Sequence, residues 1–452
     1  MPSAPGFRTV ALIIASALFM EQLDGTILAT ALPAMARSFD VSPLHLSVAL
    51  TSYMLSLAVF IPASGAVADR FGARRVFTWA IVLFTVGSAL CGQAESVLVL
   101  VLARLLQGIG GAMMVPVGRM VLLRSVSKAE LVSAMSWLLV PALIGPVLGP
   151  PLGGLIVSYL SWRWIFYVNL PIGLLGVWLA RRYIADVRSE VRYRFDGLGL
   201  VLSGMALSCL VFGLELGGRG ALDLGSTLGL LALGAAFWLA YMWHARRTEH
   251  PLLDLSLMRF DTFRLSVYGG SLSRIPTGAM PFLLPLLMQL GFGMSAVHSG
   301  LVTFVSSAGA MLMKATAKPI LTRFGFRTVL VWNGALTALL IGSCALFGPG
   351  WPLWAIYLLL ALGGIGQSLQ YTAYNTVAYA EVPTERFGDA TAFYSTFQQL
   401  MLSMGICVAA GVLHAATALH GREQTLLADF PWAFGVVVAV SLLAVPVVAR
   451  LK

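Results

Sequence analysis

Apolar runs about as long as a bilayer crossing recur along the whole chain, and no other feature of the sequence restricts the fold as strongly. The chain has 452 residues, of which 58% are hydrophobic and 11% are charged, and its mean hydropathy is +0.87. A soluble fold of this length cannot hide so much apolar surface. Helices of about 20 apolar residues span a hydrocarbon core of roughly 30 Å. The sequence therefore predicts an all-α polytopic membrane protein.

Charged residues, Gly and Pro divide the apolar runs into 14 expected spans. Each run is long enough to cross the bilayer as a helix. In chain order we expect the spans near 9–34, 45–68, 76–94, 97–121, 132–159, 164–182, 197–217, 224–244, 264–290, 297–318, 328–347, 353–378, 390–415 and 430–449.

The distribution of basic residues predicts the orientation of these spans. With a cytoplasmic N-terminus, 21 of the 29 Lys and Arg residues fall in cytoplasmic segments and four fall in outer loops. The other four lie within or at the ends of spans. The positive-inside rule therefore favours cytoplasmic N- and C-termini. The net charge of +10 is explained by these arginines, so it does not indicate nucleic-acid binding.

An internal repeat predicts two related halves. The segments "DRFGARRVFTWAIVLFTVGSALC" from Asp69 and "TRFGFRTVLVWNGALTALLIGSC" from Thr322 share eight identities at an offset of 253 residues. Both follow an even-numbered span on the cytoplasmic side. Duplicated halves are typical of transporters. We expect a six-helix bundle over 1–185, a basic linker with two inserted helices over 186–262, and a second six-helix bundle over 263–452.

Five motifs resemble those of one transporter family. "GAVADRFGARR" from Gly65 resembles the loop motif of the major facilitator superfamily, and "RLLQGIGGAMMVP" from Arg104 resembles its arginine motif. "GPVLGPPLGG" from Gly145 resembles its antiporter motif. "LDGTILATALP" and "WRWIFYVNLPIG" resemble its 14-spanner drug:proton antiporter subfamily. The chain is thus identified as similar to this subfamily, with two six-helix bundles and two inserted helices.

That resemblance implies proton-coupled efflux of amphipathic small molecules by alternating access in the bacterial cytoplasmic (inner) membrane. It implies no cofactor and no metal, because the proton gradient supplies the energy. It implies a monomer in the lipid bilayer, and it leaves a periplasmic adaptor and an outer-membrane channel open. An exporter or facilitator of one specific metabolite or lipid-like compound has the same fold. An enzyme is disfavoured, since the six histidines lack metal-ligand spacing and no phosphate-binding loop is present.

Two acids within the first span are the candidates for proton coupling. Glu21 and Asp24 are three residues apart and so share one side of a helix. A charge at that depth costs about 2.5–3.5 kcal/mol on insertion scales, so it normally has a partner. The resemblance makes the first and fourth spans neighbours, which selects Arg104 as the partner of Asp24. A static pair that only fixes helix packing is the alternative. The motif assigns no role to Glu21, which could be a second protonation site, a cation-recognition site or a hydrogen-bonded carboxyl.

The loop motif predicts a conformational latch. The resemblance places Asp69 near the start of the eleventh span, where the positive end of a helix dipole favours an acid. The alternative is that the arginines of the motif serve only as topogenic charges. The expected latch residues are Gly65, Asp69, Arg70, Gly72 and Arg74.

The antiporter motif concentrates small residues and prolines in the fifth span. Small residues allow close helix approach and prolines kink a helix, so the motif fits either an antiport element or a structural kink. Its residues are Gly145, Pro146, Gly149, Pro150, Gly153 and Gly154.

The substrate cavity is expected to take residues from both halves. Tyrosine and glutamine side chains offer stacking and hydrogen bonds to a flat amphipathic ligand. The twelfth span contains no acid, which disfavours substrates with several positive charges. The candidates are Tyr53, Arg274, Gln370, Tyr371, Tyr374 and Gln399.

Overall fold

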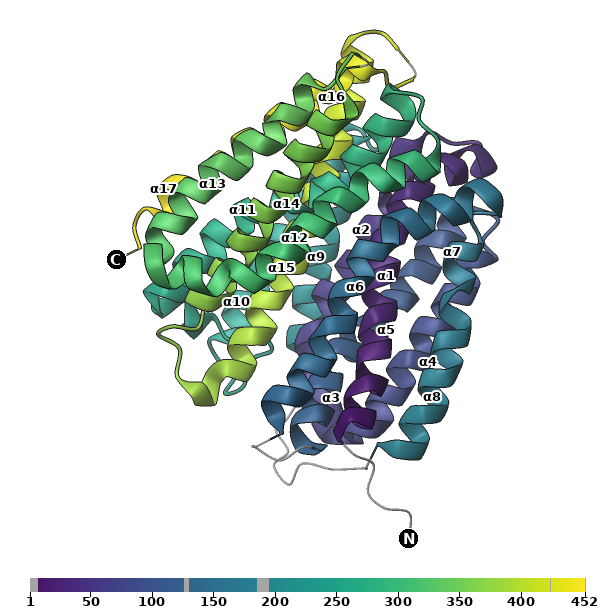
Figure 1. Ribbon diagram of the computed structural model, residues 1–452. Helices are drawn as coiled ribbons and strands as arrows, with labels where there is room; N and C mark the ends of the chain where they lie inside the picture. Colours follow the sequence, from purple (N-terminus) through teal and green to yellow (C-terminus); the bar gives the residue numbers. More distant parts are fainter. Residues whose placement is uncertain (1–6, 126–129, 185–194, 349, 423, 452) are drawn as a thin grey trace.

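The computed structural model describes residues 7–125, 130–184, 195–348, 350–422 and 424–451, and within these ranges every regular element is helical (Figure 1). The first half contains α1 (Phe7–Phe39), α2 (Ser47–Phe60), α3 (Ser64–Phe71), α4 (Ala73–Gly92), α5 (Val97–Ser125), α6 (Leu131–Tyr159), α7 (Trp164–Tyr167) and α8 (Asn169–Tyr183). A hairpin of α9 (Gly197–Gly218) and α10 (Leu224–Ala245) follows. The second half contains α11 (Asp261–Leu286), α12 (Ala296–Phe324), α13 (Phe326–Gly342), α14 (Leu353–Val377), α15 (Phe387–Leu419), α16 (Phe430–Leu442) and α17 (Ala444–Val448).

Each expected span coincides with a helix or with consecutive helical segments. Among the described residues, 12 helical segments are long and apolar enough to cross a membrane. The fifth expected span contributes a shorter apolar stretch, Leu143–Tyr159 of α6. The ninth coincides with α11, which is not among the 12 and carries Arg274 and three prolines. The apolar pattern thus located the helices well.

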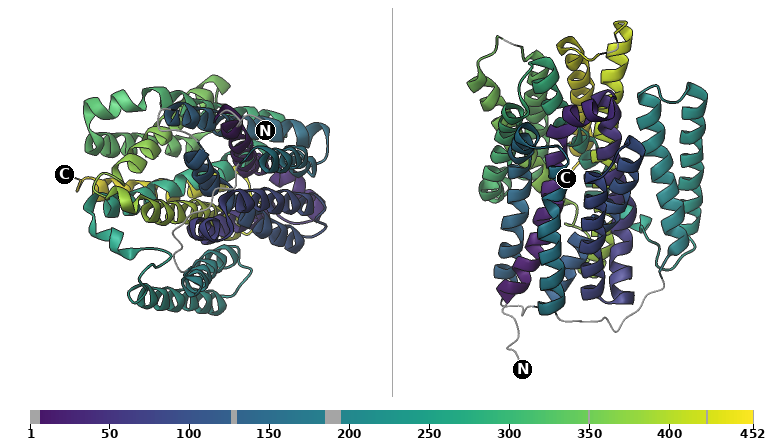
Figure 2. Two further views of the ribbon diagram at one scale, coloured as in Figure 1. Left: turned by 90° about the horizontal axis from the view of Figure 1, so that it is seen from below. Right: turned by 90° about the vertical axis from the view of Figure 1, so that its right-hand side faces the viewer.

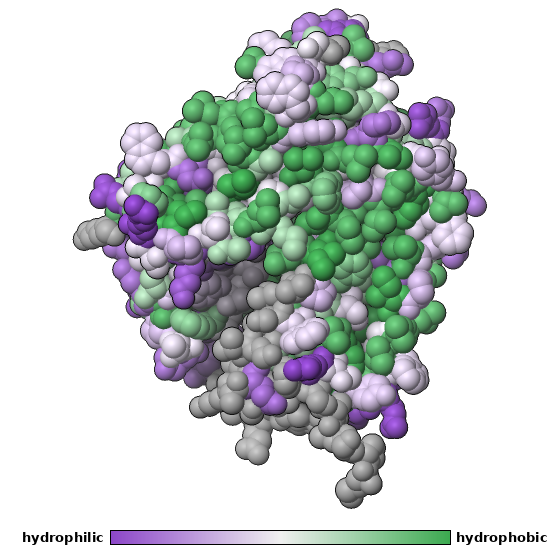
Figure 3. Space-filling view, viewed as in Figure 1, coloured by the Kyte–Doolittle hydropathy of each residue, from purple (hydrophilic) through white to green (hydrophobic). Residues whose placement is uncertain are grey.

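The surface of the molecule is that of a multi-pass membrane protein. Large apolar side chains are exposed on helices that face outward, such as Leu98 on α5, Trp178 on α8 and Trp332 on α13. Hydrophobic residues form a broad band across the face seen in Figure 3, with hydrophilic side chains gathered toward its ends. Such a band is unfavourable in water and fits a lipid environment.

The helices pack as two groups that meet at few places. In the first group α1 packs on α5, α6 and α8, and in the second α11 packs on α14, α15 and α16. The groups touch where α6 meets α12 and where α2 meets α15. Helix α9 packs on α10, α15 and α2, so the α9–α10 hairpin lies at the periphery, as Figure 2 shows.

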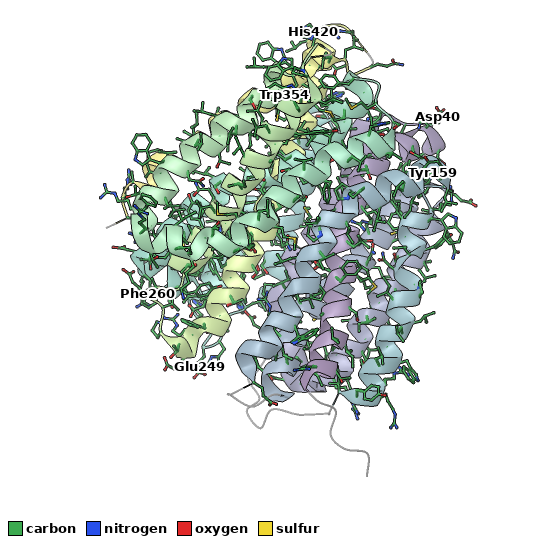
Figure 4. The ribbon with its side chains drawn as sticks, viewed as in Figure 1. Asp40, Tyr159, Glu249, Phe260, Trp354 and His420 are labelled. Carbon is green, nitrogen blue, oxygen red and sulfur yellow. The ribbon has the colours of Figure 1, made fainter. Side chains whose placement is uncertain are left out.

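The hydrophobic cores show where the two groups are joined: they share a core at one end, and a second shared core links α2 with α9 and α15. One core combines α1 residues from Ile27 to Ala36 with α11 residues from Ala279 to Leu286, so it belongs to both groups. Asp40 and His420 lie toward this joined end in Figure 4, whereas Glu249 lies at the opposite end. At that opposite end each group has cores of its own. Separate cores leave room for a cavity between the groups.

The sequence repeat is also a structural repeat. Gly72 ends α3 and precedes α4 with φ 92°, and Gly325 ends α12 and precedes α13 with φ 76°. Both turns need a backbone conformation that glycine adopts without strain. The duplicated "RFG" segment therefore sets the same tight helix–helix turn in both halves.

Candidate functional site

A cavity of about 1680 Å³ separates the two groups at the end where their cores are independent. Its walls come from both groups, with Glu21 of α1 and Arg119 of α5 on one side and Lys314 of α12 and Tyr371 of α14 on the other. Its mouth is lined by charged residues at helix ends, among them Asp69 and Asp389. The cavity is large enough for a drug-sized molecule.

Behind the α1 wall, Asp24 is the centre of a buried polar network. Its Oδ2 lies 2.5 Å from Nη1 of Arg104, and both side chains are almost fully buried. Its Oδ1 accepts hydrogen bonds from Nε2 of Gln107 at 2.9 Å and from Nδ2 of Asn169 at 3.0 Å. Donors from α5 and α8 thus surround one acid of α1, an arrangement that fits an ionised carboxylate. The expected pairing of Asp24 with Arg104 is present.

Arg104 is held in place by contacts beyond the ion pair. Its Nε donates to the carbonyl oxygen of Ala49 at 3.1 Å, and its guanidinium lies 4.3 Å from the ring centroid of Tyr53. Its Nη1 also donates to Oε1 of Gln107 at 2.8 Å, while its Nη2 has no hydrogen-bond partner among the described residues. A fork of donors with one free arm can retain the carboxylate through a small rearrangement.

Glu21 occupies a different setting one turn away on α1. It lines the cavity, although its side chain is buried, and its Oε2 has no hydrogen-bond partner in the described structure. Asp24 does not line the cavity. The two acids therefore divide into one that is enclosed and fully bonded and one that borders the cavity and is incompletely bonded.

The glycines of the antiporter motif pack α6 against the stretch of α1 that carries Asp24. A Cβ atom at Gly149 would lie 2.0 Å from Oγ1 of Thr26, and one at Gly153 would lie 2.3 Å from Oγ1 of Thr30. On the next face, a Cβ atom at Gly154 would lie 2.4 Å from the carbonyl oxygen of Ala296 in α12. The motif lets α6 approach both groups closely, so a structural reason exists for its small residues.

The second group contains a buried arginine without an acid. The Arg274 guanidinium lies 5.1 Å from the ring centroid of Tyr371 and 5.3 Å from that of Tyr394. Together with Gln370 and Tyr371 it lines a small pocket of about 20 Å³, enough for one water. Tyr371 borders both this pocket and the large cavity.

The predicted cavity residues occupy three kinds of position. Tyr371 and Gln399 line the large cavity, whereas Arg274 and Gln370 line the small pocket. Tyr53 and Tyr374 line neither. Tyr53 is buried over Arg104, and Tyr374 is buried against Gly269, so the placement of these two differs from the expectation. Apolar composition did not reveal which side of each helix faces the cavity.

Three of the latch residues lie at the mouth of the cavity. Gly65, Asp69 and Arg70 line it, as do Glu385, Phe387, Gly388 and Asp389 around the start of α15, whereas none of the described lining residues belongs to α13. Arg74 faces away and donates to the carbonyl oxygen of Ile184.

The start of α15 is itself tied to the linker before α11. Arg386 forms an ion pair with Asp254 and a hydrogen bond with Ser256. Burial opposes ionisation of Asp254, but hydrogen bonds from Ser256 and the nearby Arg386 outweigh it and lower the pKa of this carboxyl. The segment that faces the loop motif is thus anchored by charge.

Two members of the Asp24 network were not assigned to it from the sequence. Gln107 follows Arg104 by three residues and therefore shares its side of α5, a spacing that could have indicated it. Asn169 begins α8. It joins the network by bridging Asp24 and Oγ of Ser88. Within the described residues no group of three or more His, Cys, Asp or Glu side chains is placed to hold a metal.

Comparisons with known proteins agree with this architecture. The sequence model of the Major Facilitator Superfamily matches residues 14–406 and 267–452. The chain is 40% identical over 432 residues to the "Putative multidrug resistance protein MdtD" of Cronobacter sakazakii, covering 94% of this chain and 89% of that protein. It is 40% identical to the protein of the same name from Klebsiella pneumoniae, covering 92% and 87%.

Solved transporter structures share the fold at low sequence identity. An auto-inhibited peptide transporter of the POT family superimposes with a TM-score of 0.70 at 17% identity, covering 98% of this chain and 97% of that one. The nucleoside transporter NupG superimposes with a TM-score of 0.63 at 14% identity, covering 99% and 100%. At such identities the likeness concerns the fold alone.

Proposed function

The chain belongs to the major facilitator superfamily, and from that premise we propose that it is a proton-coupled antiporter that exports amphipathic small molecules, drugs among them, across the bacterial inner membrane. It is a transporter and not an enzyme. The printed name of its relatives, multidrug resistance protein, supports this class of substrate.

The contrast between two acids on α1 carries the proposal. Asp24 is enclosed and bonded to Arg104, Gln107 and Asn169, while Glu21 borders the cavity with one oxygen unpaired. A carboxylate that loses its pairing when the halves move can load a proton in one state and release it in the other. Glu21 lies between Asp24 and the cavity along the same helix, which suits it to relay that proton.

The transport cycle follows from rocking of the two halves about the joined end. We place 14 spans in the membrane, with six in each half and the α9–α10 hairpin inserted, and both termini in the cytoplasm. The cavity then faces the cytoplasm, so a compound enters it while Asp24 is ionised. After the halves rock, a proton from outside takes the place of the Arg104 contact and the compound leaves. Coupling requires only that proton and substrate stabilise different states.

The remaining parts of the proposal concern the latch, the antiporter motif and the partners. Asp69 closes against the start of α15 in the outward-open state, where the positive end of that helix favours an acid. The α6 motif seals α1 against α12. The protein needs no cofactor beyond the proton gradient and works as a monomer.

The test is a panel of amphipathic compounds of every charge applied to the purified protein in proteoliposomes. We expect several unrelated compounds to trigger proton movement down an imposed pH gradient. A response to one compound alone would favour a specific metabolite exporter. Proton movement with none of them, in liposomes that retain folded protein, would contradict the proposal.

A further inference from the structure

The second group exposes two cations to one tyrosine ring and supplies no acid to balance them. The Arg274 guanidinium lies 5.1 Å and Nζ of Lys314 lies 4.9 Å from the ring centroid of Tyr371. Arg274 is buried, whereas Lys314 is exposed in the large cavity, where its Nζ is 3.5 Å from Oγ1 of Thr372. Within the described parts of the chain, neither cation has an ion-pair partner.

The helices around Arg274 and Lys314 contain almost no acid to balance these two positive charges. Helices α12, α13 and α14 contain no Asp or Glu, and the single acid of α11, Asp261, pairs with Arg264 at the first turn. The acids that line the cavity lie on α1 or at the mouth. They are Glu21, Asp69, Asp196, Glu385 and Asp389. The wall formed by α11, α12 and α14 therefore carries uncompensated positive charge.

A buried guanidinium without an anion is costly at membrane depth, and the groups around Arg274 compensate it only in part. The tyrosine rings attract it by cation–π interaction. Among the described residues its Nη2 has no hydrogen-bond partner, and neither has the hydroxyl of Tyr374. Charged residues inside membrane proteins usually pair with a counter-charge, so the missing partner points to a ligand.

We propose that Arg274 and Lys314 form a binding site for the anionic group of a substrate, so that the exported compounds include aromatic amphipaths that carry a carboxylate. This inference rests on the proposed transport function and names its substrate class. The aromatic body lies in the cavity beside Tyr371, and the carboxylate meets Lys314 first. Rotation of Tyr371, which separates the small pocket from the cavity, then admits the carboxylate to the planar donors of Arg274.

The inference is tested by the binding of matched acid–amide pairs to the full-length protein in nanodiscs. Naphthaleneacetate, indole-3-acetate and 4-phenylbutyrate are each compared with their amides, which keep the ring and lose the charge. At neutral pH we expect at least one acid to bind about tenfold more tightly than its amide. Arg274→Gln and Lys314→Gln should each bring that ratio toward one. Arg274→Lys should retain part of it.

The controls separate a local charge effect from misfolding. Lys318→Gln removes a cation one turn along α12 that does not line the cavity, so the acid–amide ratio should not change. If Arg274→Gln does not fold, the Lys314→Gln variant alone still tests the inference, because the Lys314 side chain projects into the cavity. Ratios near one for all three pairs in the wild type, or ratios unchanged in both Gln variants, would overturn the inference.

This outcome is distinguishable from failure of the proposed function. If neutral or cationic compounds drive proton movement and the acids bind no better than their amides, only the anion site is wrong. If no compound moves protons while an acid binds with the expected preference, the anion site stands and proton-coupled transport is wrong.

Discussion

The two halves each bury an arginine beside a tyrosine, and they treat it in opposite ways. Arg104 of the first half pairs with Asp24 at 2.5 Å and packs on Tyr53, whereas Arg274 of the second half packs on Tyr371 and Tyr394 with no acid in contact. An arginine paired with a carboxylate suits a site where that carboxylate exchanges its contact with the cation for a proton. An arginine without an acidic partner suits a site that binds the anionic group of a ligand. The comparison assigns coupling to the first half and ligand recognition to the second.

The repeat makes this difference more informative. The halves retain the same glycine turn at Gly72 and Gly325, so this helix–helix connection is alike in both. The charged residues are not all retained, since Thr322 stands where the first copy has Asp69. The duplicated segment has kept its turn but differs in its charges.

The largest loss of transport is expected when Asp24, the paired acid of the first half, is replaced. Asp24→Asn keeps the shape of the side chain but cannot carry a proton, so export driven by a pH gradient should fall by roughly 100-fold, near the upper end of ordinary coupling free energies. Substrate counterflow, which needs no net proton movement, should persist and show that the variant is folded. Asp40→Asn is the matched control, because Asp40 is exposed and asparagine tolerates its positive φ. Unchanged gradient-driven export in Asp24→Asn would remove Asp24 from the mechanism.

A smaller effect is expected when the second half is given the acid it lacks. Gln367 lines the small pocket with Arg274, so Gln367→Glu should supply an internal partner and make this arginine resemble Arg104. Binding of carboxylate probes should weaken by about tenfold, whereas transport of neutral compounds should remain. The equivalent amides provide the control in each binding assay. Equal losses for acids and amides would indicate general damage to the cavity instead.

The packing of α6 against the part of α1 that carries Asp24 can be disturbed by one methyl group. Gly153→Ala places a Cβ atom 2.3 Å from Oγ1 of Thr30 and 2.7 Å from the carbonyl oxygen of Ile27, and overpacking of this kind costs about 1–3 kcal/mol. Lower thermal stability and slower proton-driven transport should follow. Gly435→Ala in α16 meets no atom within 4 Å and should leave both unchanged. Equal behaviour of the two variants would separate the α6 motif from the function of α1.

The smallest effect is expected at Glu21. Glu21→Gln keeps the cavity wall intact and removes one titratable group, so we expect a narrowed substrate range with about fivefold losses for some compounds, at the low end of coupling effects. Transport of the compound panel by the variant is the measurement. If every compound is transported as by the wild type, Glu21 is a hydrogen-bonded wall residue without a role in coupling.

The sequence predicted helix positions well because apolar runs of bilayer length leave few alternatives. It also predicted the pairing of Asp24 with Arg104, because charges at membrane depth need partners. It did not predict the rotation of the helices. In a membrane protein, lipid-facing and buried sides are both apolar, so periodicity did not show that Tyr53 turns toward Arg104 or that Asn169 reaches Asp24.

The most direct test of the account is proton release on ligand binding, measured with a pH indicator on purified protein in weakly buffered, mildly acidic solution. The account predicts that a transported compound displaces protons from the wild type and from Arg274→Lys, while Asp24→Asn binds the same compound and releases none. Proton release by Asp24→Asn equal to that of the wild type would contradict the claim that Asp24 carries the proton which the substrate displaces.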